Sequence, residues 1–355
     1  MLYLHIGLSK TGSSALQFFF KTNAHVLQEH GITYPAHTFD NNRVSPGNGV
    51  DVAVLLRDGR DEEARENFQQ LQSSEHKHLL LSSELFGFYL REDRIKHLAE
   101  LVGPAKIVVY LRRQDEVIIS KYNQRVKRFG YVVPFDEWIA DILSDPGQLH
   151  DLFFDRLLAD WGRAFGDANL IVRPYESEQW YAETIFSDFL HHCFGIEMDE
   201  AFVLPHGNIN VSYCDDALEF MRLANCLEIA DNILDNALQA YSDVYGGDSC
   251  RMAMRPGQRR ALLTKFAEVN SYVAQRYVGR SDGKLFYSAS PNPDDYWHEY
   301  AGSTKRGICV IGDFIRAHDG PAFEKLRTEI EKSLHSGSGN ILEAAEKLAA
   351  VLQKE

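Results

Sequence analysis

Short apolar runs alternate with longer amphipathic segments along the first half of the chain. The runs are rich in Leu, Ile and Val and have the length of strands, whereas the segments between them repeat their apolar residues with the period of a helix. We predict strands over residues 2–6, 31–35, 78–82, 106–111 and 169–173, and helices over residues 13–28, 58–72, 93–102 and 115–128, with two more between 134 and 161. This alternation is typical of an α/β fold, in which helices flank a parallel sheet.

Helical patterns dominate after the last predicted strand. We expect helices over residues 179–193, 215–240 and 257–278, and two charged amphipathic helices in the tail from residue 321 to 355. The expected organisation is an α/β core over residues 1–178, a helical part of the same domain over 179–290, and a C-terminal extension over 291–355. The predicted architecture is therefore a P-loop-like parallel sheet with a helical C-terminal part.

A glycine turn joins the first predicted strand to the first predicted helix. The strand ends at Gly7, and small or hydroxylated residues are frequent from there to Ser14. Backbone N–H groups can converge in such a turn, and the helix dipole adds roughly half a positive charge, so we expect a phosphate or sulfate group to bind there. Gly7 and Gly12 have the spacing of the nucleoside-triphosphate P-loop, but Ser13 and Ser14 stand where that loop has Lys and Ser or Thr.

The lysine of this turn, Lys10, lies inside the loop instead of after the second glycine. The order Lys10, Thr11, Gly12, Ser13, Ser14 resembles the 5'-phosphosulfate loop of sulfotransferases that use 3'-phosphoadenosine 5'-phosphosulfate (PAPS). Taken alone, so short a stretch also fits a general anion-binding loop. The resemblance implies that these five residues bind PAPS and that Lys10 also acts in catalysis, by neutralising the charge that grows on the bridging oxygen.

A second cluster of polar residues follows the strand predicted over residues 106–111. Arg112 and Arg113 stand there instead of the Asp with which a Walker B strand holds magnesium, and Ser120 lies eight residues after Arg112. An arginine at a strand end and a serine in the following helix could close on one phosphate. Tyr110, Arg112 and Ser120 resemble the 3'-phosphate-binding motif of the same sulfotransferases, which implies that Arg112 and Ser120 bind PAPS.

The two motifs together make the chain similar to the PAPS-dependent sulfotransferase family over about residues 2–287, and to its bacterial members in particular. One departure is Arg113-Gln114, where many animal relatives have Asp-Pro. The resemblance implies transfer of the sulfuryl group from PAPS to an acceptor hydroxyl without a required metal, with a carbohydrate or glycolipid as the acceptor suggested by the bacterial members. A nucleotide-dependent kinase on a related P-loop scaffold is the leading alternative, and a non-catalytic nucleotide-binding or assembly protein is a third.

Glu84 follows the strand predicted over residues 78–82. In open parallel sheets ligands bind beyond the carboxyl ends of the strands, so Glu84 lies where chemistry is expected. Its position alone favours another role, that of the N-terminal capping acid of a helix over residues 85–89. The family places its general base at this strand end, as Glu in the heparan-type enzymes, and the resemblance therefore favours Glu84 as the catalytic base.

Residues for the acceptor are less clearly marked. Lys121, Arg125 and Arg128 form one basic stripe on the helix predicted over residues 115–128, which fits either a solvated face or a contact with an anionic acceptor. We take Asn123, Gln124 and Arg125 as candidate acceptor contacts. The acceptor pocket itself is expected from the variable segments, here residues 36–49 and the helices after 179. His191-His192-Cys193 is no convincing metal site, because neighbours in sequence point to different sides of a helix.

Composition excludes some partners. Among the 355 residues, 51 acidic and 37 basic side chains give a formal charge of -14, which disfavours nucleic acid and anionic membranes. An anionic cofactor therefore needs a local basic site. We expect a cytoplasmic protein without a transmembrane segment, because the chain has no apolar run of about 18 residues or more and its cysteines are scattered and odd in number: Cys193, Cys214, Cys226, Cys250 and Cys309.

Overall fold

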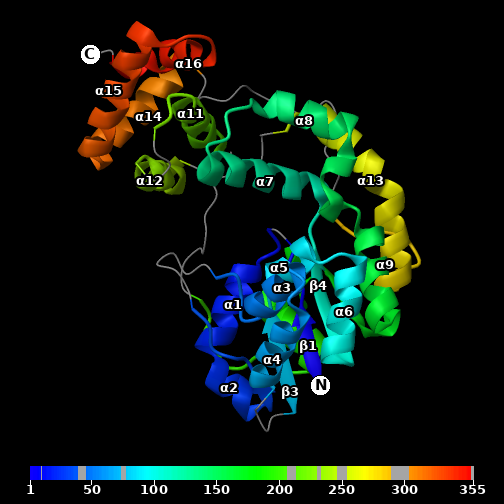
Figure 1. The fold of residues 1–355 in the computed structure, drawn as a ribbon. Coiled ribbons are helices and arrows are strands. Elements are labelled where there is room, and N and C mark those ends of the chain that lie inside the picture. The colour runs from blue at the N-terminus through cyan, green and yellow to red at the C-terminus, as the bar shows by residue number, and fades with distance from the viewer. Residues whose placement is uncertain are drawn as a thin grey trace. The chain divides into compact units, whose positions relative to one another are not determined.

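The computed structural model describes residues 1–8, 10–38, 45–72, 77–205, 213–229, 233–245, 254–288 and 304–352. It consists of two compact units (Figure 1). The first unit comprises Met1–Val117, Gly147–Asn210 and Leu263–Ala289, and the second comprises Ile118–Pro146, Val211–Leu262 and Ser290–Glu355. Helices α7 (Gln114–Phe129) and α13 (Pro256–Tyr277) each contribute residues to both units. The sequence analysis divides the chain into consecutive parts at residues 178 and 290, whereas each unit collects several separated segments. The predicted division therefore stays a prediction.

The first unit is built around a five-stranded parallel sheet, which confirms the predicted α/β class. Its strands are β1 (Leu2–His5), β2 (Ile32–Thr33), β3 (His78–Ser82), β4 (Ala105–Leu111) and β5 (Leu170–Pro174), in the order β2-β3-β1-β4-β5. β1 lies between β3 and β4, with His5 paired in register with both Ser82 and Val108. The carboxyl ends of these three strands therefore meet at one edge of the sheet.

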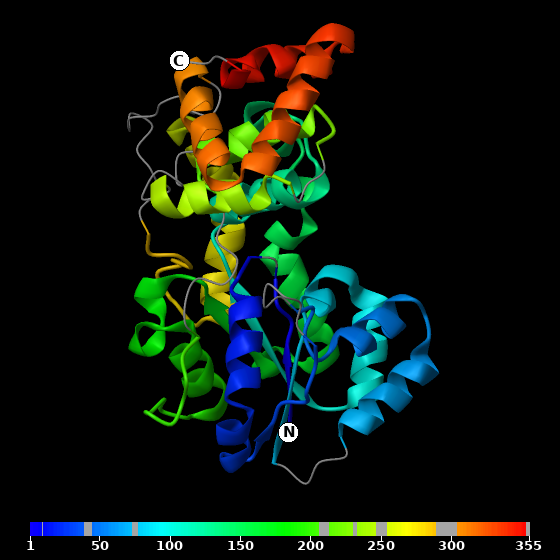
Figure 2. The ribbon, with the colours of Figure 1, turned by 90° about the vertical axis from the view of Figure 1, so that its left-hand side faces the viewer.

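Helices cover both faces of this sheet, as near-continuous apolar strands require. One face packs on α1 (Ser13–Thr22), α2 (Ala24–Glu29) and α10 (Ile185–Phe194), and the other on α3 (Val50–Arg57), α4 (Asp61–Leu71), α5 (Glu84–Tyr89), α6 (Glu92–Val102) and α9 (Phe154–Phe165). In Figure 2 the dark blue α1 and α2 lie on one side of the strands and the lighter blue and cyan α3 to α6 on the other.

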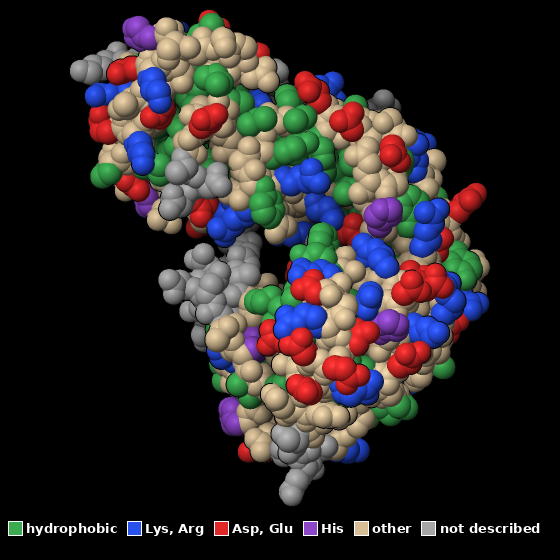
Figure 3. Space-filling model, in the orientation of Figure 1, with side chains coloured by type: hydrophobic (Ala, Val, Ile, Leu, Met, Phe, Trp, Pro, Cys, Tyr) green, Lys and Arg blue, Asp and Glu red, His purple; other side chains and the backbone are tan. Residues whose placement is uncertain are grey.

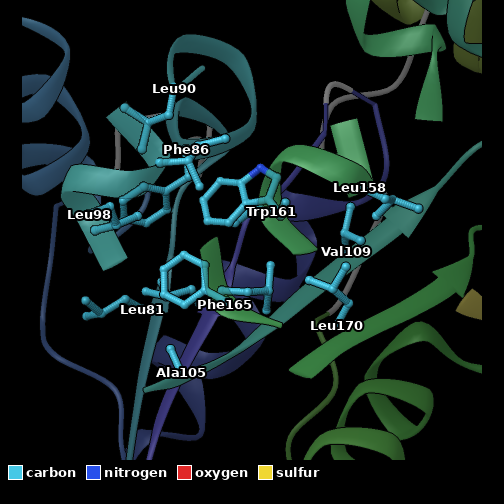
Figure 4. Close-up of a cluster of buried hydrophobic side chains, with 14 of the residues drawn as sticks. Leu81, Phe86, Leu90, Leu98, Ala105, Val109, Leu158, Trp161, Phe165 and Leu170 are labelled. Atoms are coloured by element: carbon cyan, nitrogen blue, oxygen red, sulfur yellow. The ribbon is translucent and has the colours of Figure 1, made fainter. Parts of the chain in front are cut away.

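The larger core lies on the second face (Figure 4). There Phe86 of α5 and Trp161 of α9 gather with Leu81 and Val109 of the sheet, and all four side chains are buried. Trp161 also stacks on Phe165, with ring centroids 5.7 Å apart. Burying a side chain of this size contributes about 1.5–3 kcal/mol. This core fixes α5, and with it Glu84, at the end of β3.

Charged side chains of both signs lie on the face of this unit that Figure 3 draws. Figure 3 shows them interspersed over α4 and α6, where Arg94 pairs with Asp61 at 3.1 Å. Such exposed pairs contribute little to stability, about 0–1 kcal/mol. The drawn face of α4 and α6 therefore carries no field of a single sign.

Three predicted elements of this unit are wrong in detail. The helix predicted over residues 13–28 is broken at Asn23, whose side-chain amide bonds to the carbonyl oxygens of Phe19 and Val203 at 2.9 Å and accepts from the N–H of Val203 at 2.7 Å. Helix α3 was not predicted, and the charged helix after it begins at Asp61 and not at residue 58. Helix α10 begins at Ile185 and not at residue 179, because Thr184 caps it.

The second unit is helical, as predicted for the C-terminal part. Its helices besides α7 and α13 are α8 (Phe135–Ser144), α11 (Asp215–Asn225), α12 (Asp235–Tyr245), α14 (Lys305–His318), α15 (Gly320–Ser336) and α16 (Asn340–Leu348). The single helix predicted over residues 215–240 is two helices. The two helices predicted in the tail from residue 321 are confirmed as α15 and α16, whereas α14, which Thr304 caps with its side chain, was not predicted.

Candidate active site

The end of β1 carries the predicted glycine turn, and α1 begins directly after it. Gly12 has φ 77° and ψ 13°, a left-handed conformation that favours glycine, and Lys10 has φ 69°. The buried hydroxyl of Thr11 donates to the carbonyl oxygen of Leu8 at 2.8 Å and so closes the turn on itself. The chain therefore passes from the turn directly into α1. The first N–H groups of a helix have no partner within the helix, and with the helix dipole they favour an anion at this end.

Ser13 places a buried hydroxyl in this turn. Its side chain is 1% exposed, and its Oγ has no hydrogen-bond partner among the described residues. A Cβ on Gly7 would collide with this Oγ, so the absence of a side chain at Gly7 is what leaves room for the Ser13 hydroxyl. Buried polar atoms are nearly always hydrogen-bonded, and an unpaired hydroxyl at a helix N-terminus fits an oxygen of a bound phosphate or sulfate. Ser14, the next residue, is half-buried.

Glu84 lies against the other side of the turn. It is the first residue of α5, and its Cγ is 3.2 Å from where a Cβ of Gly7 would be. Gly87, three residues on, brings α5 close to the turn: its own Cβ would be 3.0 Å from the carbonyl oxygen of Ile6. The capping role belongs to the preceding residue, since the Oγ of Ser83 accepts from the N–H of Leu85 at 3.2 Å.

Arg112 reaches the turn from the end of β4. Its Nη1 donates to the carbonyl oxygen of Lys10 at 3.0 Å, and its Nε donates to the carboxylate of Glu116 at 2.9 Å. Its guanidinium also lies over the ring of Tyr175, 5.5 Å from the centroid. Lys10, Thr11, Gly12, Ser13, Arg112 and Glu84 are thus brought to one edge of the sheet.

Tyr175 is a site residue that the sequence analysis missed. It follows β5, where its N–H donates to the carbonyl oxygen of Leu111 at 2.7 Å. Its Cε2 lies 2.9 Å, and its Oη 3.3 Å, from the place of a Cβ on Gly12. Burial raises the pKa of its phenol, which therefore stays protonated as a donor. The signal that could have found it is its place just beyond a strand end, the same rule that pointed to Glu84.

A buried polar cluster lies behind the turn and was also missed. The Nδ1 of His5 and the Oγ of Ser82 are 2.8 Å apart, and the Nε2 of Gln17 donates to the same Oγ at 3.2 Å. Burial lowers the pKa of His5 to about 4, so the ring is neutral near pH 7. The signal in the sequence was a histidine within an otherwise apolar strand.

The remaining predicted residues lie in the second unit. Ser120 is buried there, and its predicted meeting with Arg112 on one phosphate stays a prediction. The amide of Asn123 is also buried and donates to the carbonyl oxygen of Tyr213 at 3.0 Å, so it stabilises the packing of the second unit. Gln124 and Arg125, the other two candidate acceptor contacts, are exposed on the surface. The guanidinium of Arg125 lies over the rings of Tyr131 and Trp138, 5.4 and 5.8 Å from their centroids.

Part of the segment expected to form the acceptor pocket lies beside Glu84. The Oδ1 of Asn48 accepts from the N–H of Ser82 at 2.7 Å, and the Oγ of Ser83 donates to the carbonyl oxygen of Pro46 at 2.7 Å. Residues 45–49 therefore pack on the carboxyl end of β3. Residues 39–44 of the same segment lie outside the described residues, as does Cys250.

Two general features of the described residues bear on partners. None of the described helices combines the length and the apolar character needed to cross a membrane. Within the described ranges, no three or more His, Cys, Asp and Glu side chains group so that they could hold a metal ion. His191 and His192 instead lie near the carboxylates of Glu197 and Asp188, at 3.3 and 3.5 Å.

Fold and site together define an α/β protein whose first strand leads through a glycine turn into the first helix. No protein-family model matches the chain, and no solved structure matches it. A stretch of 124 residues, 35% of the chain, is 34% identical to an uncharacterized protein of Archaeoglobus fulgidus. The stretch spans about a third of that protein, 32% of its length. The name of this relative gives no activity, so a functional conclusion depends on the site.

Proposed function

We propose that the protein is a sulfotransferase that moves the sulfuryl group of PAPS to the hydroxyl of an acceptor, as a cytoplasmic enzyme. The observation that carries the proposal is the convergence of two groups on one turn. The Arg112 guanidinium lies 3.0 Å from the Lys10 carbonyl oxygen, and the buried hydroxyl of Ser13 has no hydrogen-bond partner among the described residues. A guanidinium, a lysine, hydroxyls and a helix N-terminus are the donor set that an anionic nucleotide needs.

The residues at this edge of the sheet carry the hydrogen-bond donors that the phosphate and sulfate groups of PAPS require. Thr11, Gly12, Ser13 and Ser14 would hold its 5'-phosphosulfate with N–H and hydroxyl donors, while Arg112 would hold its 3'-phosphate. A share of Ser120 in holding the 3'-phosphate stays a prediction from the sequence. When bound, PAPS supplies an activated sulfuryl group. Because Arg112 follows β4 where a Walker B acid would hold magnesium, the donor set favours PAPS over a magnesium nucleotide.

Lys10 and Glu84 would act on the two ends of the reaction. A bond forms between the acceptor oxygen and sulfur as the bond from sulfur to the 5'-phosphate oxygen breaks. Glu84 takes the proton of the acceptor hydroxyl, a role that contributes about 10²- to 10⁴-fold to the rate. Lys10 stabilises the negative charge on the departing phosphate oxygen, which is worth about 3–4 kcal/mol in a site that excludes water.

The test is transfer of label from [35S]PAPS to a panel of carbohydrate, glycolipid and phenolic hydroxyl acceptors in the presence of EDTA. We expect transfer without magnesium, and about a 10²- to 10³-fold lower turnover in Lys10→Ala. A matched control is Lys106→Ala, because Lys106 lies at the opposite end of β4 and donates to the carbonyl oxygen of Ala168. Absence of transfer to every acceptor, or equal activity of Lys10→Ala and Lys106→Ala, would overturn the proposal.

A further inference from the structure

A buried carboxylate follows Tyr175 at the end of β5. Glu176 is 8% exposed, although the next two residues, Ser177 and Glu178, are exposed on the surface. Burying a carboxylate is unfavourable unless hydrogen bonds replace those that it made with water. The role of Glu176 therefore follows from the groups that donate to it.

Among the described residues, four donors bond to the carboxylate of Glu176, and three of them come from one short segment. The Oε1 atom accepts from the N–H of Ser288 at 2.8 Å and from the hydroxyl of the same residue. The Oε2 atom accepts from the N–H of Tyr287 at 2.7 Å and from the side-chain amide of Gln179. Two successive backbone N–H groups thus converge on one anion, as they do where proteins bind phosphate. These four bonds form the Glu176 clasp.

The segment that the Glu176 clasp holds has no regular secondary structure. Residues 279–288 follow α13 as neither helix nor strand, so no helical or sheet hydrogen bonds fix them. Side chains fix them instead: the amide of Gln179 also donates to the carbonyl oxygen of Leu285 at 3.1 Å, and Arg280 donates to the same oxygen at 3.0 Å. Leu285 is buried in the larger core. The segment is therefore fixed at Leu285 and, beyond it, by the Glu176 clasp.

The last residue of the segment also bonds to the end of β4. The Nη1 of Arg113 donates to the carbonyl oxygen of Ser288 at 3.3 Å. Arg113 is itself held by two bonds to the buried carboxylate of Asp115, at 2.7 and 3.0 Å. The partner of Ser288 at this end is therefore a side chain whose own position is fixed.

One residue of the segment thus joins the ends of two neighbouring strands. Ser288 bonds to Glu176 after β5 and to Arg113 after β4, and these strands are adjacent in the sheet. Glu176 and Arg113 are the chain neighbours of Tyr175 and Arg112, whose ring and guanidinium meet beside the glycine turn. Because adjacent residues share a planar peptide bond, fixing the first pair restricts the second.

We propose that Glu176 is a positioning residue of the nucleotide site. By holding residues 287 and 288 it keeps the ends of β4 and β5 at a fixed separation, and with them Arg112 and Tyr175. The inference rests on the proposed function, because the site that Glu176 positions is the proposed site of PAPS. Coupling between the clasp and the nucleotide is reciprocal, so bound nucleotide stabilises the clasp by the same factor by which the clasp strengthens nucleotide binding.

Hydrogen exchange and calorimetry of Glu176→Gln test this inference without requiring turnover. Glutamine offers one acceptor oxygen where the carboxylate offers two, so the bonds on one side of the clasp are lost. We expect the amide protons of Tyr287 and Ser288 to exchange about tenfold faster or more, the factor for one hydrogen bond to a charged group. The affinity for adenosine 3',5'-bisphosphate should fall about fivefold or more. In the wild type, the same nucleotide should slow the exchange of both amides.

Two further variants serve as controls. Glu178→Gln makes the same change of charge two residues on, where the exposed carboxylate accepts from the hydroxyl of Ser177 at 3.3 Å, and it should leave exchange and affinity unchanged. Ser288→Ala removes one donor of the clasp from an exposed side chain, so the protein should fold. It should shift both measurements in the same direction as Glu176→Gln, by a smaller factor.

The inference is wrong if Glu176→Gln and Glu178→Gln bind the nucleotide with equal affinity, even when the amides of residues 287 and 288 exchange faster, because the clasp is then only structural. It is also wrong if bound nucleotide leaves that exchange unchanged in the wild type. Should Glu176→Gln not fold, the same comparison of Ser288→Ala with Glu178→Gln decides. If the wild type does not bind the nucleotide at all, the proposed function itself fails, which is a different result from the other two.

Discussion

Substituting alanine for Gly7 tests the geometry of the glycine turn. A methyl group there would collide with the Oγ of Ser13 and would lie 3.0 Å from its Cβ and 3.2 Å from the Cγ of Glu84. Rotation of the serine side chain can move its hydroxyl but not its Cβ, so strain remains. Overpacking of this kind costs about 1–3 kcal/mol. We expect Gly7→Ala to lower the free energy of unfolding of the first unit by that amount.

The assay is urea unfolding followed by tryptophan fluorescence, in a double-mutant cycle with Ser13→Ala. Removal of the hydroxyl relieves the closest contact, so Gly7→Ala should cost less in the Ser13→Ala background, with a coupling of about 0.5 kcal/mol or more. Gly257→Ala is the control, because a Cβ there would meet open space. A Gly7→Ala protein as stable as the wild type, or one whose loss does not depend on Ser13, would refute the described turn.

Three further predictions concern charge and protonation at the same edge. Arg112→Ala should weaken binding of adenosine 3',5'-bisphosphate about 10- to 100-fold in calorimetry, because it removes one charge-assisted contact. Arg112→Lys should recover part of the affinity, and unchanged affinity in Arg112→Ala would contradict the role of Arg112. Glu84→Gln should lower kcat about 10²- to 10⁴-fold and leave nucleotide affinity unchanged, and full activity would exclude Glu84 as base. Burial lowers the pKa of His5 to about 4, so between pH 6.5 and 4 only the unfolded state takes up a proton on this side chain. The free energy of unfolding should therefore fall by about 3 kcal/mol as the pH is lowered across that range. A pH profile unchanged in His5→Gln would contradict this.

The sheet could be predicted from the sequence because buried parallel strands are near-continuous apolar runs. The strand over residues 78–82 was predicted to the residue, and Glu84 was placed at its carboxyl end. Helix α3 was missed because it follows residues 45–49, which read as loop and which pack on β3 through side-chain bonds of Asn48. The break at Asn23 depends on a bond to Val203, a contact that no local pattern contains.

The site shows the same limit. Short motifs and the rule of strand ends were enough to select the turn, Glu84 and Arg112, because each follows its own strand directly. Tyr175 was missed because its importance depends on the sheet order, which puts β5 beside β4 and so brings its ring to Gly12 and Arg112. Asn123 was chosen by its place in a motif, whereas the fold uses its amide internally.

The most direct measurement is magnesium-free calorimetry of the wild type with adenosine 3',5'-bisphosphate and, in parallel, with AMP. Two separate anion sites for one nucleotide require the bisphosphate to bind about 10- to 100-fold more tightly, since the 3'-phosphate adds one charge-assisted contact. Equal affinity for the two nucleotides, or a preference for magnesium ATP over both, would contradict the proposed sulfotransferase, and the latter would favour a kinase.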